Sequence, residues 1–229
     1  MNGTLSIVMP VLNEAATIGW ALQGARQACP NAEIVVVDGG SSDGTADLAR
    51  DLADLVVLSK PGRARQMNAG ARAASGDVLL FLHADTRLPP DAEERVWEGL
   101  AGIHEWGRFD VRIEGRPRIL SLVGALMNLR SRLTGVATGD QAIFVRRATF
   151  ERVGGFPDIP LMEDVALSKS LRIITRPSCL RLKAVTSGRR WEANGPLRTI
   201  LTMWILRLAY VGGVSPERLA ELYGRLKAR

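Results

Sequence analysis

The sequence of 229 residues is poor in the residues that mark several specialised classes of protein. Its two cysteines, Cys29 and Cys179, match neither a disulfide framework nor a zinc site, so we expect a reducing compartment. Aromatic residues make up 5% of the chain, too few for a platform that stacks nucleic-acid bases, and no nucleic-acid-binding signature is present. A nucleic-acid partner is therefore not expected.

Long hydrophobic runs are also missing. The best candidate for a membrane-spanning helix, residues 197–214, is interrupted by Arg198 and Arg207 and falls short of a clean span. The N-terminal residues lead directly into a strand-like run, Leu5 to Met9, without the basic region or cleavage site of a signal peptide. These features predict a cytoplasmic protein without a spanning helix.

The overall composition is typical of a globular domain. Hydrophobic residues at 46% and charged residues at 24% are ordinary values. The length suffices for one large domain, or a domain with a subdomain, around a buried core. Lys and Arg number 30 against 24 Asp and Glu, which gives a net charge of +6. That balance suits phosphate groups, nucleic acid or an anionic membrane surface, and does not choose among them.

The first half of the chain alternates between strand-like and helix-like segments. Apolar runs predict strands at residues 5–9, 34–37, 55–58 and 78–82. Helical spacing predicts one helix that starts after Asn13, with Asn13 as its N-cap, and further helices at 46–53, 63–74 and 90–104. Alternation of strands and helices across short connections indicates βαβ units and a parallel sheet.

From about residue 106 the pattern changes. Alternating apolar and polar residues predict a half-exposed strand at 109–113, and further strands are predicted at 141–145 and 180–185. Helices are predicted at 119–133, 149–153 and 163–172, followed by two closing helices separated near Gly212. The sequence therefore predicts an α/β fold with a mainly parallel central sheet flanked by helices, and with C-terminal helices.

Polar residues follow the most apolar strand. His83 and Asp85 come directly after the run 78–82, at the edge of a parallel sheet where open α/β folds bind ligands. One residue apart, they can present two polar groups to the same ligand or cation. The simpler interpretation is a turn, because Asp and Thr are ordinary turn residues.

A second acidic residue and a basic segment share this placement. Asp38 ends a predicted strand before a Gly/Ser loop, which suits contacts to a base or ribose or, more simply, the cap of a strand–helix turn. The loop lacks the spacing of G-x-G-x-x-G or of a Walker A lysine. Arg63 and Arg65 begin a helix, where guanidinium groups can hold a diphosphate or remain solvated.

Two further groups stand late in the chain. Glu163 and Asp164 begin a predicted helix, where acidic residues are common for dipole reasons alone, although one carboxylate there can act as a general base. The sequence Arg189-Arg190-Trp191 places two cations beside an indole, which suits a pyrophosphate clamp, a stacking surface for a sugar, or the rim of a loop.

Together these segments resemble the family 2 glycosyltransferases of the GT-A fold, over nearly the whole chain. The segments that carry the resemblance are 8–14 (VMPVLNE), 36–45 (VVDGGSSDGT), 62–70, 83–85 (HAD), 139–144 (GDQAIF), 154–156 (GGF) and 163–164 (ED). Each is weak alone, but their order and spacing are specific. The stretches 139–141, 160–164 and 187–191 resemble a bacterial subgroup of small, stand-alone members.

The resemblance implies a single Rossmann-like GT-A domain, with a nucleotide-binding half at 1–104, an acceptor-binding half at 105–195 and C-terminal helices at 196–229. It implies an inverting transfer from a nucleotide-diphospho-sugar, assisted by Mg²⁺ or Mn²⁺. Asp85 would be the metal ligand, and Asp164, with its neighbour Glu163, would be catalytic. The residues implied to bind the nucleotide-sugar are Pro10, Val11, Asn13, Glu14, Asp38, Arg63, Arg65, His83, Ala84, Asp140, Arg190 and Trp191.

Two positions depart from the family pattern. His83 replaces the first Asp of the D-x-D motif, so two carboxylates are not available; His can ligate Mn²⁺ or contact ribose but makes a weaker site for Mg²⁺. Ser187 stands where processive relatives have the Gln of Q-x-x-R-W. With no spanning helix predicted, a single-transfer enzyme fits better than a processive polymerase.

Other interpretations stay open at this point. A nucleotidyltransferase shares the architecture, and a membrane-surface binding module would explain the charge. The predicted helices 119–133 and 197–210 combine apolar surface with Arg, so they could lie on the inner membrane face and receive a lipid-linked acceptor. Alternatively, one packs on the sheet and the other forms a homodimer interface. The sequence does not identify the donor base, the sugar or the acceptor.

Overall fold

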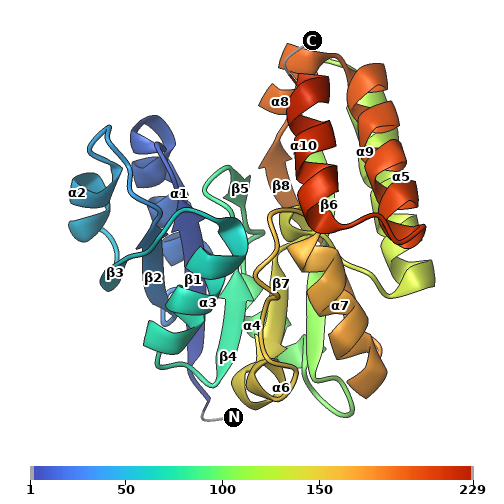
Figure 1. The fold of residues 1–229 in the computed structure, drawn as a ribbon. Helices are drawn as coiled ribbons and strands as arrows, with labels where there is room; N and C mark the ends of the chain where they lie inside the picture. Colours follow the sequence, from blue (N-terminus) through green and yellow to red (C-terminus); the bar gives the residue numbers. More distant parts are fainter. Residues whose placement is uncertain (1–2, 228–229) are drawn as a thin grey trace.

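The computed structural model describes residues 3–227, without the side chains of Arg190 and Lys227. Within this range one eight-stranded sheet runs through the molecule in the order β3-β2-β1-β4-β7-β6-β8-β5 (Figure 1). The first four strands are parallel to one another: β1 (Leu5–Val11), β2 (Glu33–Asp38), β3 (Leu55–Leu58) and β4 (Val78–Phe81).

The second half of the chain supplies the mixed part of the sheet. Strand β7 (Ile143–Arg146) is antiparallel to β4 and to β6 (Trp106–Glu114), while β8 (Ser178–Ser187) is parallel to β6. The short β5 (Thr86–Arg87) pairs antiparallel with β8. Because β7 pairs with β4, residues that precede β7 are brought beside residues that follow β4.

Helices cover both faces of the sheet (Figure 1). One face packs on α1 (Ala15–Ala28) and α4 (Ala92–Gly99). The other packs on α3 (Arg63–Ala73), α6 (Arg147–Arg152) and α7 (Glu163–Ile174). The small α2 (Thr45–Arg50) lies beside α1. The central strands β1, β2 and β4 are mostly apolar because both of their faces are buried: in β2, Ile34 and Val36 join one core and Val35 and Val37 the other.

A separate group of helices extends beyond one end of the sheet (Figure 1). It consists of α5 (Ile119–Thr134), α8 (Arg189–Asn194), α9 (Pro196–Val211) and α10 (Pro216–Lys227). A small cluster that includes Val136, Met162 and Leu206 joins these helices to the loops around α7. Within residues 3–227, no helix combines the length and the apolar character that a membrane crossing requires.

The structure corrects three sequence predictions. Asn13 is not the N-cap of α1: it has a left-handed φ of 55°, and Glu14 is the N-cap residue, without a side-chain cap. The helix predicted at 90–104 is shorter, Ala92–Gly99. The strand predicted as half-exposed at 109–113 is mostly buried, because its polar residue Asp110 is held inside by ion pairs. Strand β5 and helix α8 were not predicted.

Candidate active site at the carboxyl edge of the sheet

Two loops at the carboxyl ends of β1 and β2 are joined by side-chain hydrogen bonds. The Asp38 carboxylate accepts hydrogen bonds from the backbone N–H groups of Gly40 (3.2 Å) and Ser41 (3.0 Å). Asn13 donates its backbone N–H to Ser41 Oγ (2.8 Å) and accepts one at Oδ1 from Ser42 N–H (2.9 Å). Asp38 and Asn13 therefore shape the two loops into one rim, and Asp38 itself is buried.

The start of α3 is held against the same strand ends. The buried amide of Gln66 donates to the carbonyl of Val11 (2.8 Å) and to that of Val37 (2.9 Å). Pro10 and Val11 lie at the end of β1, beside Val37 and Asp38 of β2. These two hydrogen bonds fix the first turn of α3, which carries Arg63. Gln66 belongs to the motif 62–70, but this role was not predicted from the sequence.

Three segments that are far apart in the sequence meet beyond β4. His83, Ala84 and Asp85 follow β4, the 3-10 turn η1 (Gly139–Gln141) precedes β7, and Glu163 and Asp164 begin α7. Asp164 Oδ2 accepts a hydrogen bond from Gly139 N–H at 2.9 Å. His83 Nδ1 lies 3.6 Å from Asp140 Oδ1, and Arg63 Nη1 lies 3.6 Å from Glu163 Oε1. The topology thus gathers the acidic candidates of the sequence in one place.

The contact between Gly139 and His83 is the tightest point of this arrangement. A Cβ atom at position 139 would lie 2.4 Å from His83 Cε1, so only glycine allows the imidazole to pack there. His83 is mostly buried, with 13% of its side chain exposed, and its Nε2 has no hydrogen-bond partner among the described residues. A buried polar atom without a partner is costly, which makes it a candidate contact for a ligand.

The carboxylates shift the protonation of their neighbours. Burial raises the pKa of the Glu163 carboxyl, and the negative charge of Asp164 raises that pKa further, against the lowering effect of Arg63. Burial by itself lowers the pKa of Arg63, but four carboxylates outweigh it and raise that pKa, namely those of Glu163, Asp140, Asp164 and Asp85. This edge of the sheet is therefore a site of concentrated negative charge, which favours cations.

The donor atoms fit a cation that binds together with a diphosphate. Within residues 3–227, no three His, Cys, Asp or Glu side chains are grouped so as to hold a metal ion by themselves. Asp85 and Asp140 nevertheless line one cavity. Mg²⁺ bound with a nucleotide usually takes one or two protein carboxylates and completes its shell with phosphate oxygens and water. The carboxylates of Asp85 and Asp140 are of the type that such a cation uses.

The cavity that Asp85 and Asp140 line opens between the sheet edge and the helices α5 and α9. Its volume is about 160 Å³, and its other walls carry Arg130 and Arg207, Thr186 and Ser187 of β8, and apolar side chains including Trp191 and Trp204. Trp191 also packs in the cluster around Leu120 of α5. From the sequence, Arg207 was identified as an interruption of an apolar segment, and the arginines of helices 119–133 and 197–210 were considered for a membrane surface. That Arg130 and Arg207 line one cavity was not predicted.

Of two further predicted nucleotide-binding arginines, Arg65 and Arg190, the structure describes the side-chain contacts of Arg65 alone. Arg65 Nε donates to both carboxylate oxygens of Asp158, at 2.8 and 2.9 Å, in an exposed ion pair. Arg190 belongs to α8, and its side chain lies outside the described part of the structure. Of the three predicted arginines Arg63, Arg65 and Arg190, Arg63 is the one with a described contact to the acidic cluster, through Glu163.

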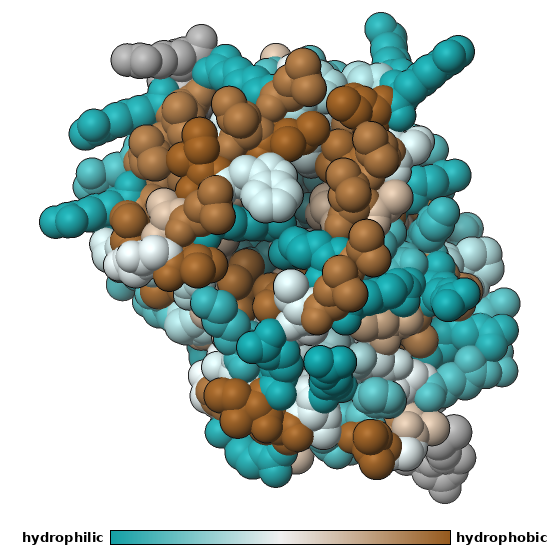
Figure 2. All heavy atoms as spheres, turned by 90° about the vertical axis from the view of Figure 1, so that its right-hand side faces the viewer, coloured by the Kyte–Doolittle hydropathy of each residue, from teal (hydrophilic) through white to brown (hydrophobic). Residues whose placement is uncertain are grey.

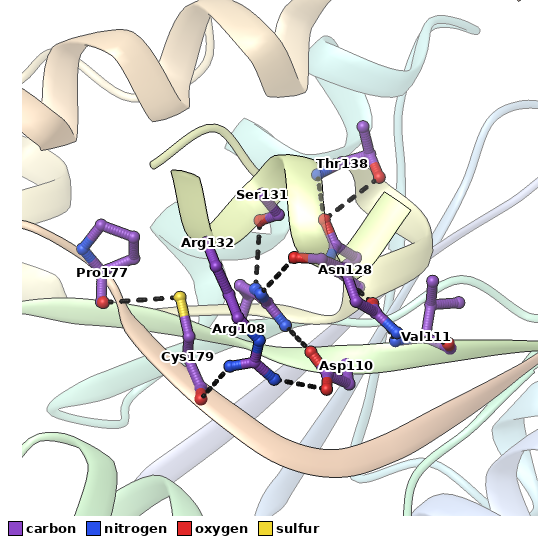
Figure 3. A network of polar contacts seen from close by, with 10 residues as sticks. Arg108, Asp110, Val111, Asn128, Ser131, Arg132, Thr138, Pro177 and Cys179 are labelled. Carbon is purple, nitrogen blue, oxygen red and sulfur yellow. Dashed lines mark hydrogen bonds and ion pairs between the residues drawn. The ribbon is translucent and has the colours of Figure 1, made fainter. Parts of the chain in front are cut away.

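A buried polar network ties α5 to the sheet and to η1 (Figure 3). Asp110 on β6 forms ion pairs with Arg108 of the same strand and with Arg132 of α5. Asn128 of α5 exchanges two hydrogen bonds with the backbone of Val111, at 2.8 and 3.0 Å. Gln141 of η1 donates to Asn128 Oδ1 at 3.4 Å. The helix that lines the cavity is therefore connected to the turn that holds Asp164.

Solved structures with the same arrangement of elements are glycosyltransferases. A mannosyltransferase from Pyrobaculum calidifontis, PcManGT, in complex with GDP-Man and Mn²⁺, aligns with a TM-score of 0.67 and 21% identity, over 90% of this chain and 63% of that one. S. aureus TarS in complex with UDP-GlcNAc aligns with a TM-score of 0.66 and 18% identity, over 81% of this chain and 59% of that one. The fold is that of the GT-A glycosyltransferases, as predicted.

Sequence comparison identifies the family. The model described as Glycosyl transferase family 2 matches residues 6–120, half of the chain. The chain therefore belongs to glycosyltransferase family 2, which confirms the resemblance seen in the sequence. A PGL/p-HBAD biosynthesis glycosyltransferase of Mycobacterium bovis is 41% identical over 165 residues, 66% of this chain and 62% of that protein.

A second relative is more distant. An undecaprenyl-phosphate 4-deoxy-4-formamido-L-arabinose transferase of Aeromonas hydrophila is 34% identical over 114 residues, 43% of this chain and 35% of that protein. The chain thus spans less than two thirds of the length of either relative.

Proposed function

We propose that the protein transfers a sugar from a nucleotide-diphospho-sugar to an acceptor hydroxyl, with inversion at the anomeric carbon. The observation that supports this most is that Asp85 and Asp140 line one cavity, while Gly139 N–H links Asp164 to the turn that carries Asp140. The complexes of similarly folded proteins with GDP-Man and with UDP-GlcNAc support a nucleotide-sugar donor. Family membership favours sugar transfer over nucleotidyl transfer.

The donor side has groups for each part of a nucleotide-sugar. The rim formed by Pro10, Val11, Asn13, Glu14 and Asp38 would receive the nucleoside, and Arg63 would approach the phosphates. Asp85, with His83 and Ala84 next to it, would hold a divalent cation together with the diphosphate. Such a cation, Mg²⁺ or Mn²⁺, would neutralise charge that develops on the leaving diphosphate.

The chemistry needs one base and no covalent intermediate. The acceptor O–H proton would pass to Asp164 as the acceptor oxygen forms its bond to the anomeric carbon. The bond between that carbon and the phosphate oxygen breaks, and the nucleoside diphosphate leaves with the electron pair. Asp164 suits the role better than Glu163, because Asp164 is partly exposed whereas Glu163 is 4% exposed and paired with Arg63.

Titration calorimetry tests the donor site. The protein is titrated with UDP, GDP and their sugars, with and without Mn²⁺. We expect Mn²⁺-dependent binding of one nucleotide, lost in Asp85→Ala and retained in Asp47→Ala, which removes an exposed carboxylate from α2. No binding of any nucleotide by folded protein with Mn²⁺ present would refute the donor site.

The acceptor side suggests a lipid-linked substrate and peripheral contact with the inner membrane face. The Aeromonas relative is named for undecaprenyl phosphate, a lipid-linked group. Helices α5 and α9 expose large apolar side chains, among them Leu126, Leu133, Leu201 and Leu208. In Figure 2 hydrophobic atoms gather on this side of the molecule around a hollow. A homodimer would cover the same helices, and sedimentation without lipid distinguishes the two, because only the dimer predicts self-association.

A further inference from the structure

The cavity between α5 and α9 is lined by two arginines, Arg130 and Arg207, and one of them has buried nitrogens without a partner among the described residues. The Nε and Nη2 atoms of Arg130 are buried and have no hydrogen-bond partner among the described residues. Arg207 of α9 lines the same cavity. A buried cation without a partner lowers the free energy of unfolding by roughly several kcal/mol. Arginines in such a place are rarely kept unless they bind a ligand.

The two charges act on each other. Burial lowers the pKa of Arg130 to about 10, and the positive charge of Arg207 is the next largest cause. Burial also lowers the pKa of Arg207, while Asp164 and Asp140 raise it. Both shifts mean that the folded cavity disfavours its own positive charge. An anion placed between the two guanidinium groups would remove that penalty.

The surroundings define the rest of the ligand. Val123, Leu126 and Met127 of α5 face Ile200, Met203 and Trp204 of α9 across the cavity. Figure 2 shows hydrophilic atoms on the floor of the hollow and hydrophobic atoms around its mouth. Apolar surface at the rim and cationic forks below it complement an amphiphile with an anionic head.

We propose that Arg130 and Arg207 form the subsite for a phosphate monoester group of a membrane amphiphile that serves as acceptor through a hydroxyl group, with its apolar chain along α5 and α9. Two guanidinium forks match a phosphate monoester, which carries a charge of about −1.5 to −2, better than a single carboxylate. The proposal rests on the proposed transferase function, because the same cavity is lined by Asp85 and Asp140 of the proposed reacting centre.

Vesicle co-flotation tests the subsite. The full chain is mixed with vesicles of phosphatidylcholine alone, with added phosphatidic acid, or with added phosphatidylserine, whose phosphate is a diester. We expect phosphatidic acid to increase vesicle binding by about tenfold or more over phosphatidylserine, the effect of one charge-assisted contact. Arg130→Gln and Arg207→Gln should lose this preference.

The controls separate the subsite from general electrostatics and from misfolding. Arg118→Gln removes an exposed arginine at the start of α5 and should keep the preference. Arg207→Lys keeps the charge but loses the fork, so an intermediate preference is expected. Circular dichroism and Mn²⁺-dependent nucleotide binding are measured on every variant, and only folded variants count.

Three outcomes would overturn the proposal. If Arg118→Gln loses the preference for phosphatidic acid as strongly as Arg130→Gln and Arg207→Gln do, the preference comes from general surface charge. If the wild type shows no preference for phosphatidic acid, the proposed subsite does not exist. Binding of glycerol 3-phosphate or inorganic phosphate that is lost in both Gln variants, without vesicle binding, would make the ligand a soluble phosphate. If nucleotide binding is absent while the lipid preference holds, the donor function fails and the subsite stands.

Discussion

The two sides of the candidate active site differ in how their polar groups are satisfied. On the proposed donor side, Asp38, Asn13 and Gln66 all bond to neighbouring loops or strand ends. On the proposed acceptor side, Arg130 has buried nitrogens without partners among the described residues, and nearby leucines are exposed. The loops of the donor edge are thus held by bonds within the chain, with His83 Nε2 as an exception, whereas the acceptor cavity has charge and apolar surface left for a ligand. The predictions below test this contrast.

The largest effect is expected from Asp164→Asn, which should separate the two sides. Loss of a general base slows transfer by about a hundredfold to ten-thousandfold, while the donor rim is untouched. The measurements are initial rates of sugar transfer and the Kd for the nucleotide with Mn²⁺. Asp47→Asn on α2 serves as the matched control. If nucleotide binding falls as strongly as the rate, Asp164 belongs to the donor side.

A smaller effect on transfer is expected from a substitution at Gly139, in the turn between the proposed donor and acceptor sides. In Gly139→Ala the new methyl group would overlap the His83 ring, with Cβ at 2.4 Å from Cε1. Overpacking of this kind costs about 1–3 kcal/mol of unfolding free energy, and the displaced turn should also slow transfer. Urea denaturation and transfer rates measure both.

The contact at Gly139 has an internal check. In the His83→Ala background, Gly139→Ala should lose most of its stability cost, because the overlapping ring is gone. Gly224→Ala, at a position on α10 with no atom within 4 Å of the added Cβ, should not destabilise the protein and should gain about 0.5–1 kcal/mol of helix propensity. An unchanged cost in the double mutant would place the strain in the backbone of the turn.

The smallest effect concerns pH. Because burial and the charge of Asp164 raise the folded-state pKa of Glu163, ionising this carboxyl opposes folding. Below the ordinary pKa of 4.5, Glu163 is protonated in both states, and its ionisation does not change the free energy of unfolding. As the pH rises from 4.5 to the raised folded pKa, the free energy of unfolding falls. Above the folded pKa this loss stays constant.

Glu163→Gln should flatten this part of the stability profile. Urea midpoints measured from about pH 4 to pH 8 should fall with rising pH more in the wild type than in the variant, over the window between the two pKa values. Glu221→Gln, on the exposed surface of α10, should follow the wild type. Parallel profiles for wild type and Glu163→Gln would contradict the raised pKa.

The parts of the fold that follow local rules were predictable from the sequence. The strands β1, β2 and β4 appear as apolar runs because both of their faces are buried, and the helices between the strands have regular periodicity. The gathering of His83, Asp85, Asp140 and Asp164 followed from a family resemblance. Their separation along the chain gives no local signal, and only the β4–β7 pairing brings them together.

Other features depend on tertiary contacts that no local pattern contains. The run 109–113 looked half-exposed because Asp110 and Arg112 are polar. Arg112 is exposed, but Asp110 is held inside the protein by ion pairs with Arg108 and Arg132. Asn13 is an ordinary N-cap residue by type, yet it bonds to the neighbouring loop at Ser42. Arg130 and Arg207 stand 77 positions apart on different helices, so their shared cavity emerges only from the packing of α5 on α9.

The double attachment of α5 has an evolutionary consequence. Its inward residues, Asn128 and Arg132, bond to β6 and η1, so substitutions there would disturb the sheet and the turn together. Its outward leucines, Leu122, Leu126 and Leu129, are more than half exposed and are free of such ties. One helix thus has an inner face on which substitutions are expected to be costly and an outer face on which they are expected to be tolerated, so that the proposed acceptor surface can change without disturbing the sheet.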